Sequence, residues 1–435
     1  MLALGAALAA RGHEVSYETW TRWREPVLAA GMEFVAAPEY PVFPTRERRL
    51  GPYEAVVPAA LQSERELRAR QPHVLVHDVL TLAPALAAER LRAAGSPRTR
   101  PLSSAEAGAA DGRAPAITTL IPHLYPVAAP GMPPFGAGVR PPRIRAGVAL
   151  WRALQPAVER GLRLGRAQLN AARVRLGLPP TGRLHGGLSP ELCLVASLPQ
   201  LEYPRAWPPE AQLVGPLLWE PAQGDVALPQ DDRPLVVIAP STAHDREQRL
   251  LRCALAGLAQ EPVRVLASTN GRPLPRSFPL PANATVLDWI RYSQAMRQAA
   301  LVVCHAGFGT LARALTLGCP VVAVPRAGDM LENAARLVWS GAGLRVPWRL
   351  LSPATLRLAV RRALSTPALA ARAGEIADWA GEQDPEGRAC ELIEALASAG
   401  GLGQRATSAA RGAHDPGTAL GAREELRGRD SNPQP

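Results

Sequence analysis

The sequence has no lysine, so every one of its 49 basic side chains is arginine. The arginines are scattered along the chain, and the formal net charge of +11 therefore does not predict a nucleic-acid-binding surface. Abundant Ala, Gly and Pro without lysine is typical of a GC-rich coding sequence. A weak contact with an anionic membrane surface is left open by this charge.

The sequence also lacks long apolar runs and paired cysteines. No stretch of about 18 apolar residues is present, so no transmembrane helix is predicted. The opening segment MLALGAALAA has no basic residues before it and is interpreted as the end of an amphipathic helix rather than a signal peptide. The five cysteines show no metal-ligand spacing. Cys193, Cys304 and Cys319 lie in β-like runs and are predicted to be reduced core residues, which indicates a cytoplasmic protein.

The length of 435 residues and the hydrophobic content of 47% predict two globular cores. Short β-rich runs alternate with helical ones, a pattern typical of an α/β fold with parallel sheets. Strands are expected near 14–18, 32–36, 73–77, 116–121 and 192–196, and then near 234–239, 262–267, 284–288, 300–304, 320–324 and 343–346.

Breaks in the pattern divide the chain. Residues 1–218 are predicted to form an N-terminal domain and residues 234–398 a C-terminal domain, joined by the aperiodic linker 219–233. Residues 93–114 are expected to be a disordered insertion, and residues 399–435 a disordered tail. The Pro/Gly-rich residues 126–145 are expected to form a long loop.

The most informative segment is HAGFGT at residues 305–310, which follows the apolar run AALVVC. Glycines directly after a strand allow backbone N–H groups to approach an anion closely. The helix that begins there adds the positive end of its dipole. The segment therefore predicts a diphosphate site.

Several segments resemble one family in its order along the chain: RGHEV, HVLVHD, LEYPR, VGPLLWEP, VIAPST, HAGFGT and DMLENAAR, spanning about residues 1–395. The sequence is similar to the nucleotide-sugar-dependent glycosyltransferases of the GT-B fold, the UDP-glycosyltransferase-like enzymes that modify macrolides and other lipophilic natural products. The resemblance implies two Rossmann-like domains that face a cleft. It also implies transfer of a hexose from a UDP- or dTDP-sugar to a hydroxyl group, as in antibiotic biosynthesis.

The resemblance assigns the donor diphosphate to the HAGFGT turn. His305 is expected to donate a hydrogen bond to the diphosphate, beside the N–H groups of Gly309 and Thr310. Gly307 completes the turn. The alternative is a histidine that only caps the turn.

Further donor contacts are expected from four other segments. Ser241 and Thr242 follow a strand and are either phosphate contacts or helix N-caps. Trp289 either stacks on the nucleobase or belongs to the core. Asp329 matches the acidic residue that binds sugar hydroxyls, and Asn333 is expected to face a phosphate.

The sequence departs from the family pattern at other positions. Arg313 stands where plant-type relatives carry a ribose-binding Glu, and Met330 replaces the usual Gln beside the acidic residue. The sequence therefore does not distinguish a UDP-sugar from a dTDP-sugar donor, and it does not identify the sugar. Arg336 is interpreted as a solvated or salt-bridged surface charge.

The residues expected to deprotonate the acceptor are less completely represented in the sequence than the donor-binding residues. Asp78 corresponds to the residue that orients the catalytic His in the family, or it is a plain helix N-cap. His13, His77 and His123 are not expected to be the base. Because the chain opens inside a helix, we expect that a first strand and the loop with that His precede it, and that the 435-residue chain has little activity.

The implied mechanism is an inverting displacement in which a His–Asp pair deprotonates the acceptor and the phosphate turn stabilises the leaving diphosphate. No cofactor or metal is expected, because no Asp-x-Asp motif appears. One alternative is a catalytically inactive donor-binding or helper subunit of another glycosyltransferase. Another, disfavoured by the LEYPR and WEP segments, is a nucleotide-sugar epimerase. Acceptor identity and oligomeric state stay open.

Overall fold

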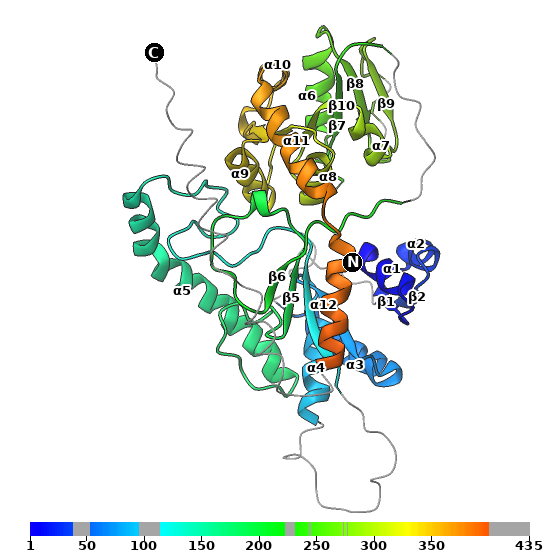
Figure 1. Ribbon diagram of the computed structural model, residues 1–435, viewed down its shortest axis with the longest axis vertical. Coiled ribbons are helices and arrows are strands. Elements are labelled where there is room, and N and C mark those ends of the chain that lie inside the picture. Colours follow the sequence, from blue (N-terminus) through cyan, green and yellow to red (C-terminus); the bar gives the residue numbers. More distant parts are fainter. Residues whose placement is uncertain are drawn as a thin grey trace, which may run out of the picture.

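The computed structural model describes residues 1–37, 53–94, 114–221, 231–242, 245–272, 274–275 and 277–399. The predicted insertion, the middle of the predicted linker and the predicted tail fall largely or wholly outside these ranges. The described chain forms two α/β halves, each built on parallel strands (Figure 1). None of its helices combines the length and apolar character needed to cross a membrane.

The N-terminal half contains two separate parallel sheets, β1-β2 and β3-β4-β5-β6. Its elements are α1 (Leu2–Ala10), β1 (Ser16–Thr19), η1 (Thr21–Trp23), α2 (Arg24–Ala29), β2 (Glu33–Ala36), α3 (Val56–Arg70), β3 (Val74–Asp78), α4 (Ala83–Ala94), β4 (Ala116–Ile121), α5 (Arg145–Arg175), β5 (Leu192–Val195), η3 (Pro199–Leu201) and β6 (Ala211–Leu213). Strands β1 and β3 are not hydrogen-bonded to each other. The expected further strand concerns residues before Met1 and stays a prediction.

The C-terminal half is built on one six-stranded parallel sheet in the order β12-β11-β10-β7-β8-β9. Its elements are β7 (Leu235–Ala239), α6 (Arg249–Leu258), β8 (Arg264–Ser268), β9 (Ala284–Leu287), α7 (Tyr292–Arg297), β10 (Ala299–Cys304), α8 (Phe308–Thr316), β11 (Val321–Ala323), α9 (Met330–Ser340), β12 (Gly343–Arg345), η4 (Trp348–Leu350), α10 (Pro353–Leu364), α11 (Pro367–Gly381) and α12 (Pro385–Ala399). The chain winds outward from the centre in both directions, so the strand order reverses between β7 and β10.

The predicted strands are confirmed to within a few residues, and the fold class with them. The buried strands LVVIA and AALVVC were evident because strands covered on both faces are nearly continuous apolar runs. Strand β6 was missed because its three residues, AQL, give no such pattern. Cys193, Cys304 and Cys319 are buried free thiols, as predicted, and burial raises the pKa of Cys304 to about 12.

One hydrophobic core joins the two halves. Leu124, Leu198 and Leu201 of the N-terminal half are fully buried in the same cluster as Phe308 and Met330 of the C-terminal half. These apolar side chains lie just beyond the carboxyl ends of β4, β5, β10 and β11. The ends of both sheets therefore face each other across a packed contact.

Helix α12 returns to the N-terminal half, which differs from the predicted boundary at residue 398. Cys390 and Ile393 pack in one cluster with Leu4, Leu120 and Leu194. Figure 1 shows α12 lying along the N-terminal half, beside α1 and the strands. The chain therefore crosses between the halves twice, and α12 belongs by packing to the first.

The contact between α1 and α12 predicts that the stability of the fold decreases at low pH. Hydrogen bonds from Arg11 and His13 lower the pKa of Glu394 to about 2, below its usual 4.5. Because the folded-state pKa is depressed, the stabilisation is present above about pH 4.5 and is lost as the pH falls toward 2. Glu394→Gln should therefore flatten the loss of melting temperature between pH 6 and pH 3, measured by circular dichroism. Glu382→Gln is the control, and parallel curves for wild type and Glu394→Gln would contradict the prediction.

Candidate active site

The reversal of strand order between β7 and β10 marks the place for a ligand. In open parallel sheets, ligands bind outside the carboxyl ends of the strands at such a switch point. Cys304 at the end of β10 pairs with Ala239 at the end of β7, so the following residues, His305 and Pro240, flank the crevice. The Nδ1 atom of His305 lies 3.4 Å from the carbonyl oxygen of Ala239. The HAGFGT turn thus lies at the switch point of the second sheet.

The turn itself has an uncommon backbone. Ala306 is fully buried and has a φ of +66°, a left-handed conformation that costs a residue with a Cβ of order 1–3 kcal/mol. Gly307 is the N-cap of α8, and no side chain caps this helix. A Cβ added at Gly307 would lie 2.4 Å from Nε2 of His305, whereas a Cβ at Gly309 would meet nothing within 4 Å. Gly307 therefore makes room for the imidazole, and the first turn of α8 borders open space.

Helix α9 supports this turn from the side. Asn333 is fully buried and donates from Nδ2 to the carbonyl oxygen of Ala306 at 2.9 Å and to the Asp329 carboxylate at 3.1 Å. Asp329 is the half-buried N-cap residue of α9. The Oδ1 atom of Asn333 is buried and has no hydrogen-bond partner among the residues that the structure describes. Asn333 therefore holds the strained turn and Asp329 together, and its expected contact with a phosphate stays a prediction.

The remaining predicted donor residues lie around the same edge of the sheet. Ser241 is buried and Thr242 exposed directly after β7, and the carbonyl oxygen of Thr242 accepts a hydrogen bond from Arg272. Trp289, just after β9, is 55% exposed, so it is not a core residue. A Cβ at Gly271 would lie 3.0 Å from its ring. The indole therefore rests on a glycine backbone and presents aromatic surface to solvent.

Arg313 has a partner that the sequence reasoning did not find. Its guanidinium donates to the carbonyl oxygen of Trp219 at 2.8 Å and lies 3.6 Å from the carboxylate of Glu220. Glu220 also accepts hydrogen bonds from the backbone N–H groups of Tyr292 and Ser293. These contacts fix the WEP segment to α7 and α8. The guanidinium of Arg313 is therefore occupied by Trp219 and Glu220. The carboxylate of Glu220 is visible in the VGPLLWEP segment, but its distance from Arg313 along the chain conceals the pairing.

In the N-terminal half, Asp78 ends β3 and is half-buried. Its carboxylate accepts a hydrogen bond from the backbone N–H of Leu80 at 2.8 Å, which forms a local turn. Among the described residues, no histidine is hydrogen-bonded to this carboxylate. The relay role of Asp78 stays a prediction.

Three histidines of this half have structural partners. His77 is buried, burial lowers its pKa, and its Nε2 atom lies 2.8 Å from the hydroxyl of Thr119. His13 lies against Glu394 of α12, on the outside of the fold. Of the three, only His123 lies near the core that joins the two halves. Its ring stacks on Phe135, with ring centroids 5.7 Å apart. That none of the three is the catalytic base stays a prediction.

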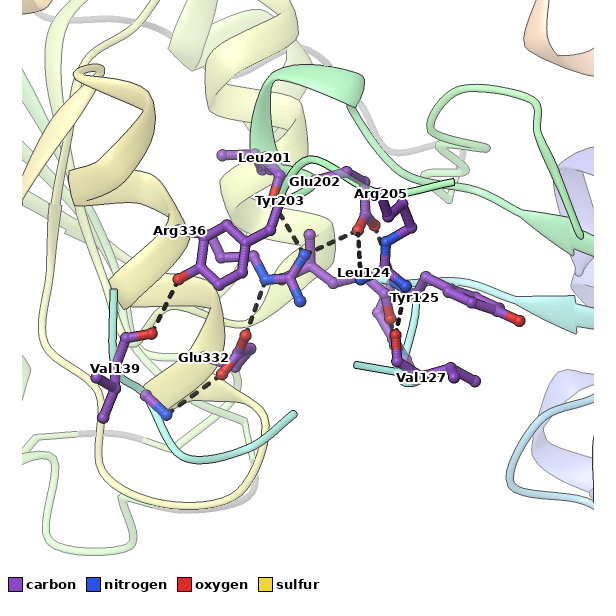
Figure 2. Close-up of polar contacts among 12 residues, drawn as sticks. Leu124, Tyr125, Val127, Val139, Leu201, Glu202, Tyr203, Arg205, Glu332 and Arg336 are labelled. Carbon is purple, nitrogen blue, oxygen red and sulfur yellow. Dashed lines mark hydrogen bonds and ion pairs between the residues drawn. The ribbon is translucent and has the colours of Figure 1, made fainter. Parts of the chain in front are cut away.

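A buried ionic cluster beside α9 joins the two halves (Figure 2). Arg336 of α9 is buried and donates to Glu332 one turn earlier and to Glu202 of the LEYPR segment, both at 2.8 Å. Its guanidinium carbon lies 4.2 Å from the ring centroid of Tyr203. The interpretation of Arg336 as a surface charge was wrong, because the other half of the chain supplies a carboxylate and an aromatic face that bury it.

The same cluster fixes the Pro/Gly-rich loop 126–145. Glu332 accepts a hydrogen bond from the backbone N–H of Gly138 at 3.2 Å, and the Tyr203 hydroxyl donates to the carbonyl oxygen of Val139 at 3.0 Å. Arg205 donates to the carbonyl oxygen of Val127 in the same loop. The loop is therefore anchored to the helix that begins at Asp329, as Figure 2 shows.

The arrangement as a whole is that of a GT-B glycosyltransferase, and solved structures agree. The glycosyltransferase of kitacinnamycin matches with a TM-score of 0.69 over 91% of this chain and 94% of its own, at 21% identity. The calicheamicin glycosyltransferase CalG4 matches with a TM-score of 0.67 over 93% and 95%, at 22% identity. At these identities the structures establish the fold.

Sequence relatives establish the family. The family model of the C-terminal domain of erythromycin biosynthesis protein CIII-like proteins matches residues 253–397. O-mycaminosyltylonolide 6-deoxyallosyltransferase of Streptomyces fradiae is 30% identical over 90% of this chain and 93% of its own length. 4'-demethylrebeccamycin synthase of Lentzea aerocolonigenes is 32% identical over 64% of this chain and 68% of its own length. The chain belongs to this family of natural-product glycosyltransferases, as its sequence motifs predicted.

The ionic cluster predicts a large loss of stability when its centre is removed. Arg336→Met removes the cation from buried Glu332 and leaves buried Glu202 with only the more distant Arg205, 3.9 Å away, and breaking such a buried pair typically costs about 3–5 kcal/mol. The free energy of unfolding, measured by urea denaturation, should fall by this amount. Arg388→Met, which removes an exposed pair with Glu391, should cost no more than about 1 kcal/mol. Equal losses in the two variants would show that the cluster is not a buried ionic contact.

Proposed function

We propose that this glycosyltransferase moves a hexose from a nucleoside-diphosphate sugar to a hydroxyl group of a lipophilic small molecule, with inversion at the anomeric carbon. The donor diphosphate is proposed to lie at the first turn of α8, the sugar near Asp329, and the nucleobase on Trp289. These residues follow the carboxyl ends of β9, β10 and β11.

The observation that carries this proposal is the free space at Gly309 in the uncapped first turn of α8. The N–H groups of a helix start have no partner within the helix and attract anions. His305 lies beside this turn and adds a side-chain donor. When the sugar–phosphate bond breaks, negative charge grows on the diphosphate, and donors fixed beforehand stabilise it. This supports a leaving-group site that uses protein groups alone, and no metal is proposed.

The relatives narrow the ligands under this proposal. The glycosyltransferase VinC was solved in complex with dTDP, and the spinosyn rhamnosyltransferase SpnG was solved with thymidine diphosphate and with spinosyn aglycone. We infer that this chain also takes a nucleoside-diphosphate donor and a lipophilic aglycone. The anchored loop 126–145 is proposed to border the acceptor, because it contacts the helix that begins at Asp329.

We propose that a His–Asp pair with Asp78 removes the acceptor proton, with the His outside the described residues. An inactive donor-binding or helper subunit is the second candidate, and it is favoured by the local turn that the Asp78 carboxylate makes with Leu80.

The donor site is tested by a substitution that fills the free space. Gly309→Ala should keep the stability, since alanine favours a helix over glycine by roughly 0.5–1 kcal/mol. It should weaken binding of thymidine or uridine diphosphate about tenfold or more, about 1.4 kcal/mol, because the new methyl group occupies the space of a phosphate. His305→Ala should weaken it by on the order of 1.5–3 kcal/mol. Calorimetric titration measures both.

Gly374→Ala is the matched control, since Gly374 also lies in a helix, α11, with nothing within 4 Å of an added Cβ. It should bind the diphosphates like the wild type. Unchanged affinity in Gly309→Ala would place the diphosphate elsewhere and remove the observation on which the proposal depends.

Transfer itself is tested with dTDP- and UDP-sugars and a panel of lipophilic alcohols. We expect formation of a glycoside with the opposite anomeric configuration, identified by mass spectrometry and nuclear magnetic resonance. Tight diphosphate binding with no product would favour the helper subunit. Fast turnover that His123→Gln abolishes would identify a different base.

A further inference from the structure

The long helix α5 has two very different ends. Near its C-terminus, Leu169 and Ala172 are buried in one cluster with Ala60 of α3 and Leu86 of α4. Toward its N-terminus only one side of the helix touches the body of the protein, through half-buried residues such as Trp151 and Leu162. Figure 1 shows α5 on the outer flank of the molecule, with its N-terminal part reaching away from the sheets.

The free side of this helix is apolar. Leu150, Leu154 and Leu164 are 57%, 42% and 65% exposed. Spacings of four and ten residues correspond to about one and three helical turns, so the three leucines lie on one face. The exposed residues between them on that face are small: Ala153, Ala157 and Gly161. We call this face the leucine stripe.

Arginines border the stripe. Residues 140–175 contain nine arginines and a single carboxylate, Glu159. Arg160 is exposed and borders the stripe, while Arg152 and Arg163 are exposed farther round the helix on the same side. Glu159 pairs with Arg163 at 3.1 Å, and among the described residues neither Arg152 nor Arg160 forms an ion pair. The flank therefore presents positive charge that the surrounding protein does not neutralise.

An apolar helical face with a basic flank is the pattern of a helix that lies in the interface of a membrane. The leucines enter the boundary between headgroups and acyl chains, while arginines reach the phosphates. A second copy of the chain fits less well. Pairing two stripes would bring two basic flanks together with only one carboxylate from each helix.

We propose that the leucine stripe and its arginines bind α5 to the surface of an anionic lipid bilayer. The proposal goes beyond glycosyl transfer and does not depend on the acceptor. Binding is peripheral: the apolar face enters the interface, and the arginines attract anionic headgroups. The loop 126–145, which leads into α5, would then lie near the membrane.

Co-sedimentation of the full chain with vesicles tests this. Vesicles of phosphatidylglycerol and phosphatidylcholine should sediment the protein at about 0.1 M salt, whereas pure phosphatidylcholine vesicles should not, and high salt should weaken binding. Leu150→Ser, Leu154→Ser and Leu164→Ser combined should lower the bound fraction about tenfold or more. Arg152→Glu with Arg160→Glu should have the same effect, through charge alone.

Matched controls carry the same changes elsewhere. Leu280, Leu350 and Leu358 are similarly exposed, at 59%, 62% and 61%, and their replacement by serine should leave binding unchanged. Arg297→Glu with Arg349→Glu is the charge control. Melting curves establish that each variant is folded.

Three results would overturn the proposal. The wild-type chain could fail to sediment with anionic vesicles, or it could bind neutral and anionic vesicles equally. The third is a dimer, seen by analytical ultracentrifugation, that dissociates in the triple serine variant, because a second copy would then cover the stripe.

Discussion

The buried guanidinium of Arg336 is the contact on which the arrangement of the two halves depends. A charge taken out of water must find partners, and here Glu332 comes from its own helix while Glu202 comes from the other half. Buried ion pairs often add little net stability compared with apolar residues, but they tolerate few alternative geometries. Leu198 and Leu201 supply the apolar contact beside it. The leucines supply attraction between the halves, and we infer that the ionic cluster selects one orientation.

This orientation connects the two ligand sides through α9. Asp329 and Asn333 lie at the first turn of the helix, next to the turn with the left-handed Ala306. Arg336 lies on the second turn and contacts the segment that anchors loop 126–145. The donor side and the loop are thus fixed by residues within two turns of one helix. A strained backbone persists only where its surroundings determine it, and the amide of Asn333 provides that here.

Much of the fold could be predicted from the sequence, because strands buried on both faces are apolar runs and the HAGFGT turn follows one of them directly. Both signals are local. The burial of Arg336, the pairing of Arg313 with Glu220 and the return of α12 could not be predicted in this way. Each of these contacts joins residues far apart in the chain. The sequence around an arginine is the same whether or not a distant carboxylate pairs with it in the fold. Strand β6 was missed for a different reason, since three residues are too few to show a period.

The two halves also differ in how their chemistry is encoded. The proposed donor side uses backbone N–H groups, a helix start and glycines, which require particular residues at fixed spacing and so leave a motif. The proposed acceptor side consists of a loop whose position is set by two hydrogen bonds, from the backbone N–H of Gly138 to Glu332 and from the Tyr203 hydroxyl to the carbonyl oxygen of Val139. Because the loop is held through its backbone atoms, its own side chains are little constrained. The loop can therefore vary in sequence and still stay anchored. A fold of this kind can retain one donor site while its acceptor changes, which is why a family assignment leaves the aglycone open.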